Sequence, residues 1–138
     1  MIMKILILTL FLVSLKVLYN LYYFWTAAIN SNVMTAIFKH MFKLLSLQGG
    51  YLRIGAPQIK ELPLPKTSTE VKAKIIRLCK KYLDLVQVSF KIEKDSNKWI
   101  SIKDEIEKLD KKIDEEVYKL YGLSPEEIAI VEGGGKNG

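Results

Sequence analysis

The chain has 138 residues, which is enough for about one domain with a modest hydrophobic core. Its net charge of +6 arises entirely from the first 60 residues, which contain Lys and Arg but no Asp or Glu. This asymmetry favours a polyanionic partner, either nucleic acid or an anionic membrane surface. A single cysteine, Cys79, excludes an intramolecular disulfide, so we expect a reduced cytoplasmic setting.

Residues 1–29 form a strongly apolar segment, with Lys4 ahead of the run 5–13 in the manner of a secretory signal. Lys16 lies inside the apolar stretch 5–29, where a cation costs about 3 kcal/mol on membrane-insertion scales, and Asn20 follows it. No small-residue cleavage site follows the apolar core promptly. We therefore expect a buried segment that needs cover from the rest of a larger protein, with a membrane anchor through residues 5–29 as the alternative.

A helical pattern begins near Leu21, and the polar run Asn30-Ser31-Asn32 interrupts it with side chains that can cap a new helix. The second helix has apolar residues at helical spacing, namely Val33, Ile37, Met41, Leu44 and Leu45. Lys39, His40 and Lys43 fall on other faces, as a solvated basic edge or as phosphate contacts. His40 is the sole histidine, so we expect no metal site.

Residues 49–54 (Gly-Gly-Tyr-Leu-Arg-Ile) predict a turn followed by a short strand. Gly49 and Gly50 end the preceding helix, because glycine readily adopts positive φ and allows another backbone to come close. Arg53 would then point outward, toward a phosphate or a guanine edge, or it is a surface arginine without a partner. Gln48 and Tyr51 could add hydrogen bonds or stacking.

Pro57 and residues 62–65 (Leu-Pro-Leu-Pro) predict a stiff connector without regular helix, with Lys60 between them as a further cation. A ligand for an aromatic groove is the alternative, although the spacing is not P-x-x-P. The connector divides the chain into a segment 1–65 and a segment 66–132.

Residues 66–132 predict an antiparallel helical hairpin followed by a short helix. Thr67 and Glu70 fit a capping box at its start. Residues of one face then recur at spacings of three and four in both arms: Val71, Ile75, Leu78, Tyr82, Leu85 and either Ser89 or Phe90, then Trp99, Ile102, Ile106, Leu109, Ile113, Val117 and Leu120. Residues 93–97 form the turn between the arms, Gly122 ends the second arm, and Ser124 to Glu127 start the last helix.

The short last helix should close over the hairpin through Ile128, Ile130 and Val131, and the Gly-rich tail 133–138 should be disordered. The second arm also carries seven carboxylates: Asp104, Glu105, Glu107, Asp110, Asp114, Glu115 and Glu116. Because lysines are interleaved with them, we interpret them as a solvated face without a catalytic role.

Three segments resemble the last part of the target-recognition region of type IIG restriction-modification enzymes and related adenine-specific DNA methyltransferases. They are residues 28–31, the run from Gly49 to Pro65, and residues 113–128 (Ile-Asp-Glu-Glu-Val-Tyr-Lys-Leu-Tyr-Gly-Leu-Ser-Pro-Glu-Glu-Ile). Ile29 departs from the leucine that the family has at its helix junction. The resemblance covers roughly residues 20–132.

The resemblance implies a mainly α chain: a partial α/β recognition fold over residues 1–65, then the hairpin and a short C-terminal helix. It implies a DNA-binding specificity module of a site-specific adenine methyltransferase, with duplex DNA and a methyltransferase catalytic core as partners. The implied DNA-binding residues are Lys39, His40, Lys43, Gln48, Gly49, Gly50, Tyr51, Arg53 and Lys60.

The chain lacks the glycine-containing loop for S-adenosylmethionine and the Asn-Pro-Pro-Tyr motif of such enzymes. We therefore expect no enzymatic activity from this chain alone and no cofactor in it, with S-adenosylmethionine bound by the catalytic partner. Two other classes of function stay open: a membrane-anchored helical-hairpin interaction protein and a self-associating coiled coil.

Overall fold

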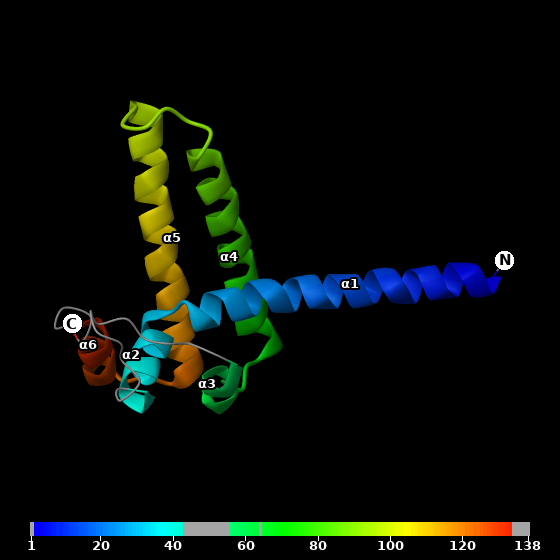
Figure 1. Cartoon of the computed structure of the whole chain (residues 1–138), viewed down its shortest axis with the longest axis horizontal. Helices are drawn as coiled ribbons and strands as arrows, with labels where there is room; N and C mark the ends of the chain where they lie inside the picture. Colours follow the sequence, from blue (N-terminus) through cyan, green and yellow to red (C-terminus); the bar gives the residue numbers. More distant parts are fainter. Residues whose placement is uncertain (1, 43–55, 64, 134–138) are drawn as a thin grey trace.

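A computed structural model of the chain describes residues 2–42, 56–63 and 65–133, with side chains from residue 14 onward. All the regular secondary structure in this part of the chain is helical (Figure 1). The helices are α1 (Ile2–Ile29), α2 (Asn32–Met41), α3 (Ala56–Glu61), α4 (Thr69–Ser89), α5 (Asn97–Tyr121) and α6 (Pro125–Gly133).

The expectation of a mainly α chain is confirmed, whereas the partial α/β fold expected over residues 1–65 is not supported. The described residues of that segment form α1, α2 and α3 and contain no strand. The predicted strand at residues 51–54 lies outside the described ranges. The apolar run at the N-terminus is helical rather than extended, since it is rich in leucine, a strong helix former.

The break between α1 and α2 lies where the polar run predicts it. Ser31 is the N-cap of α2: its Oγ accepts a hydrogen bond from the amide of Met34 and donates one to the carbonyl of Ala28. The expected apolar stripe of α2 holds in part: Val33 is buried and Ile37 packs against the cluster of Phe38, whereas Met41 is exposed. Met34 and Phe38, which were not in the expected stripe, are buried as well, and Leu44 and Leu45 lie outside the described residues. The sequence supports both stripes, and packing against Leu62 selects the one that contains Phe38.

The connector contains a short helix, α3, which the prolines had led us to exclude. Pro57 is the second residue of that helix, in the first turn, where the amide that proline lacks would have no intrahelical partner. Leu62, just beyond α3, is buried against Met34, Phe38 and Phe42. The connector is therefore attached to α2 rather than extended away from it.

The antiparallel hairpin of α4 and α5 forms as predicted (Figure 1). Its first N-cap is Ser68, whose Oγ accepts from the amide of Val71, so the predicted box on Thr67 is wrong by one residue. Phe90 lies past the end of α4 and is 84% exposed, so it does not belong to the seam. Gly122 ends α5 as predicted, with a φ of 64° that a residue with a Cβ adopts only at a cost.

Helix α6 starts with the predicted capping box. The amide of Glu127 donates to Ser124 Oγ at 3.3 Å, and Glu127 Oε2 accepts from the amide of Ser124 at 2.8 Å. Ile128 and Val131 pack against the core, but Ile130 is 72% exposed. The expectation that all three close over the hairpin therefore holds for two of them.

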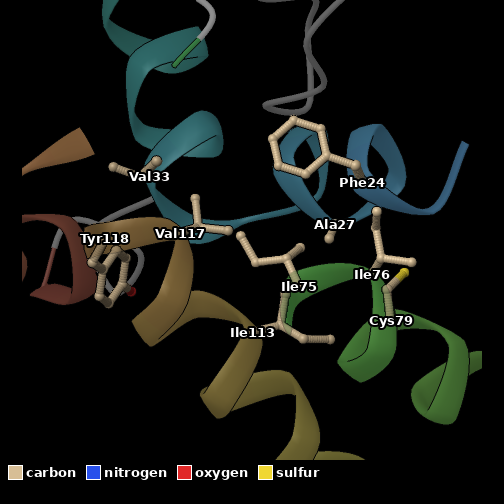
Figure 2. Packing of buried hydrophobic residues seen from close by; sticks show 9 residues of the cluster. All are labelled: Phe24, Ala27, Val33, Ile75, Ile76, Cys79, Ile113, Val117 and Tyr118. Atoms are coloured by element: carbon tan, nitrogen blue, oxygen red, sulfur yellow. The ribbon is translucent and has the colours of Figure 1, made fainter. Parts of the chain in front are cut away.

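The main core lies where α1 crosses α4 and α5 (Figure 2). Ile75 and Val117 are fully buried there, together with Phe24 and Ala27 of α1. The core combines all the long helices because the seam of a two-helix hairpin cannot be covered by its own two helices. Lys80 of α4 adds polar contacts to α1, with its Nζ 5.1 Å and 5.2 Å from the ring centroids of Tyr19 and Tyr23.

Helix α1 projects beyond the other helices toward the N-terminus (Figure 1). Several of its large apolar residues before the crossing are exposed: Leu15, Val17, Leu18, Tyr19 and Tyr22. The cover that we expect for this segment is therefore not supplied by the described part of the chain. Within the residues searched for membrane spans, which are those the structure describes, no helix combines the length and the apolar character needed to cross a bilayer.

Candidate nucleic-acid interface

Three of the nine predicted DNA-binding residues lie in the described part of the chain. Lys39 and His40 occupy the last turn of α2, Lys60 occupies the last turn of α3, and all three side chains are exposed. The other six lie outside the described residues: Lys43, Gln48, Gly49, Gly50, Tyr51 and Arg53.

A small apolar cluster joins the two helices that carry these cations. Phe38 and Phe42 of the α2 segment pack on each other with ring centroids 4.7 Å apart, and Leu62 is buried with them. Lys39 and His40 follow Phe38 directly, and Lys60 precedes Leu62 by two residues. The same packing that buries the aromatic rings therefore holds the basic turns of α2 and α3 in one region of the molecule.

A groove of about 460 Å³ runs between α2 and α6. Its lining includes Lys39 and His40 on the α2 side and Ile130 and Val131 on the α6 side. Helix α6 also carries three carboxylates: Glu126, Glu127 and Glu132. Because these carboxylates repel a polyanion, the outer surface of α2 and α3 suits contact with phosphates better than the groove does.

Asp114 connects the hairpin to the start of α2. Its Oδ1 accepts a hydrogen bond from the backbone amide of Asn32 at 2.8 Å, and its Oδ2 accepts one from Asn32 Nδ2 at 2.8 Å. Asp114 is only 8% exposed. Burial raises its pKa, with Asp110 and Glu132 adding to the effect and the Asn32 amide opposing it.

Two carboxylates of α5 are therefore not the solvated side chains that the mixed-sign pattern predicts. Besides Asp114, Glu116 is buried, and its Oε1 lies 2.7 Å from both Lys74 Nζ and Lys119 Nζ. Burial opposes ionisation of Glu116, but the hydrogen bonds from Lys119 and Lys74 outweigh it and hold its pKa below the usual range. One sequence signal could have found both residues: they flank the apolar stripe at Ile113 and Val117.

Hydrogen bonds at or beside the three segments that carry the family resemblance bring them close together where the structure describes them. Asn32, directly after residues 28–31, binds Asp114 of the segment 113–128. The Tyr121 hydroxyl of that same segment donates to the carbonyl of Pro63 at 2.9 Å. The separate motifs of the sequence thus meet around one end of α5.

Comparisons with protein-family models, with curated proteins and with solved structures find no match to this chain. In the described residues, no group of three or more His, Cys, Asp or Glu side chains is arranged to hold a metal ion.

Proposed function

We propose that the chain is a DNA-binding specificity module, equivalent to the C-terminal part of the target-recognition region of a site-specific adenine DNA methyltransferase or type IIG restriction-modification enzyme. It carries no chemistry of its own and works with a catalytic core that binds S-adenosylmethionine. The proposed setting is the cytoplasm of a prokaryote.

The observation that carries this proposal is the placement of the exposed cations on α2 and α3. The chain up to Lys60 contains no carboxylate to oppose a phosphate, and Lys39, His40 and Lys60 lie on helices joined by one apolar cluster. Each cation sits in the last turn of its helix. Such a surface suits contact with a phosphate backbone, which supplies most of the affinity of DNA-binding proteins and makes it salt-dependent.

Contacts at or beside the resembling segments are compatible with the same proposal. Asn32, the residue after the first segment, donates hydrogen bonds to Asp114 of the third, and the Tyr121 hydroxyl of the third donates to the carbonyl of Pro63 in the second. The hairpin then serves as the support that orients the basic helices, or as the surface that docks on the catalytic core.

The proposal is tested by binding of the whole chain to labelled duplex DNA, measured by fluorescence anisotropy at several salt concentrations. Affinity should fall steeply with salt, and Lys39→Ala and Lys60→Ala should each reduce the slope of log K against log salt by about one. Lys94→Ala is the matched control, since Lys94 is exposed in the turn of the hairpin, far from α2.

The control substitution should leave the slope of log K against log salt unchanged, because Lys94 lies away from the proposed phosphate-contacting surface. Binding of wild type that does not depend on salt, or an equal effect of all three substitutions, would overturn the assignment of α2 and α3 as the phosphate-contacting surface.

A membrane-anchored interaction protein is the second candidate, favoured by the exposed apolar residues of α1 between Leu15 and Tyr22. In that case the hairpin would be the interaction module and the basic helices would face anionic lipid. Carbonate extraction of cell membranes discriminates: a chain that stays with the pellet supports the anchor and argues against the DNA module, and a chain released into the supernatant does the opposite.

A further inference from the structure

The start of the basic helix α2 is held by a single acidic side chain that comes from the hairpin. Asp114 uses both carboxylate oxygens on one residue, Asn32, and it lies 82 positions further along the chain. The Tyr118 hydroxyl lies 3.5 Å from Asn32 Nδ2 and 3.5 Å from Glu132 Oε1, so α6 approaches the same point. The groups that face Asp114 are thus Asn32, Tyr118, Asp110 and Glu132.

The two hydrogen bonds restrict the orientation of Asn32 as well as its position. A carboxylate that accepts from a backbone amide and from the side chain of the same residue restricts rotation of that residue about the contact. Asn32 is the first residue of α2, and an anion at a helix N-terminus interacts favourably with the helix dipole. Val33, the next residue, packs beside Val117 in the core (Figure 2), so the polar pair and the apolar pair together set how α2 leaves the hairpin.

Stability alone does not account for this carboxylate. Burial disfavours its charged form, and the nearest acidic groups, Asp110 and Glu132, disfavour it further. Both donors of Asn32 favour the ionised form in return, because hydrogen bonds to a charged acceptor are stronger than those to a neutral one. These two hydrogen bonds also define the orientation of the first residue of α2.

We propose that Asp114 is a positioning residue, which holds the first turn of α2 on the hairpin so that Lys39 and His40, one to two turns further along, are presented at a fixed angle to DNA. This proposal rests on the proposed function. The hairpin is then more than a support, because it determines the orientation of the basic helix through one carboxylate.

The test uses the whole chain and four variants, measured for DNA affinity at one salt concentration and for thermal unfolding by circular dichroism. Asp114→Asn removes the charge and one acceptor while keeping the size of the side chain. Asp104→Asn is the matched control, because it changes the net charge by the same amount at an exposed position on the same helix. Removing an acid by itself strengthens binding to a polyanion, so charge alone predicts tighter binding for both variants.

A positioning role predicts the opposite result for Asp114. Asp114→Asn should bind DNA more weakly than wild type and more weakly than Asp104→Asn, because α2 is no longer held in one orientation, and the loss of affinity should exceed what the change in unfolding temperature accounts for. Asn32→Asp places two carboxylates opposite each other and should weaken binding at least as much. The exchange Asn32→Asp/Asp114→Asn keeps the net charge and restores a carboxylate facing an amide, so it should recover most of the affinity.

The result that overturns the proposal is an Asp114→Asn variant that behaves like Asp104→Asn, or a loss of affinity that simply follows a loss of stability and is not recovered by the exchange. If wild type fails to bind DNA, the proposed function fails instead. The positioning role is then decided by amide hydrogen exchange: protection of the α2 amides should fall in Asp114→Asn and return in the exchange variant, and unchanged protection refutes it.

Discussion

Glu116 shows at the scale of single residues how a buried charge can support the hairpin. Its carboxylate accepts from Lys74 on α4 and from Lys119 on α5, so it joins the two arms close to the core. Its neighbour Asp114 differs, because no lysine or arginine of the described residues pairs with it and burial raises its pKa. Two acids two positions apart thus differ in their effect on stability, since one is paired with lysines and the other is not.

This difference gives a prediction for Glu116→Gln. The lysines hold the pKa of Glu116 below the usual range, so its contribution to stability is complete above the unfolded carboxyl pKa of about 4.3 and is lost as the pH falls through the lower folded value. Lys74 and Lys119 are 51% and 64% exposed, so the substitution should cost only about 1 kcal/mol at pH 7.

Chemical denaturation at pH 7 and pH 3 measures the effect. The difference in stability between wild type and Glu116→Gln should shrink at the lower pH, and Glu107→Gln, which removes an exposed acid from the same helix, is the control for the loss of one charge. A constant difference between the two pH values would mean that the pair does not depend on the ionisation of Glu116.

At the scale of helices, the ends are decided by local side chains. Ser31, Ser68 and Ser96 each cap a helix by accepting an amide hydrogen bond three residues later, and Gly122 ends α5 in the left-handed conformation. The sequence predicts most of these ends because the capping chemistry is short-range. It fails at α4, where Thr67 and Ser68 are both acceptable caps and only the observed helix start distinguishes them.

Substitution of the two candidate caps tests that start. Ser68→Ala should lower the free energy of unfolding by about 1 kcal/mol, because it leaves the amide of Val71 without its partner. Thr67→Ala should change it by less than about 0.5 kcal/mol, as expected of a position outside the cap. Urea denaturation of the two variants measures both values, and a larger loss for Thr67→Ala would move the start of α4 back by one residue.

At the scale of the whole molecule, the distribution of apolar surface is uneven. Phe24, Ala27 and Ala28 of α1 are buried at the crossing with the hairpin, whereas Leu15, Val17 and Leu18 of the same helix are exposed. Several large apolar side chains exposed close together on one helix are typical of an interaction site or of a tendency to associate. Helix α1 therefore exposes apolar side chains to water in the isolated chain.

We expect the isolated chain to self-associate through this part of α1 at micromolar concentration, as seen by sedimentation velocity. Leu18→Glu should shift the distribution toward monomer, since it places a charge at a residue that is 63% exposed and has no structural role in the core. Ile100→Glu on the hairpin, where the residue is 47% exposed, is the control and should leave the distribution unchanged. A monomeric wild type would remove the basis for assigning α1 as an interaction surface.

Only part of the candidate site was predictable, because the sequence pattern does not show which side chains another helix covers. Lys39, His40 and Lys60 were identifiable because they lie off the apolar stripe or within a polar connector, and the structure leaves all three exposed. Asp114 and Glu116 were misinterpreted because an acid among lysines looks solvated whether or not another helix covers it. In α2 the sequence analysis was wrong about Met41 and missed Phe38 for the same reason, since both are apolar and only packing with Leu62 shows which one is buried.

The sequence by itself determined the helical hairpin, the break at Asn30 to Asn32, the cap that starts α6 and the acid-free character of the first 60 residues. These features were predictable because periodicity, capping and charge are properties of residues that are close together in the sequence. Only the tertiary structure decided that α1 crosses the hairpin, that α3 is helical and packs on α2, and that Asp114 holds Asn32. Those outcomes depend on which surfaces meet across long separations in the chain, and a pattern within one segment does not contain that information.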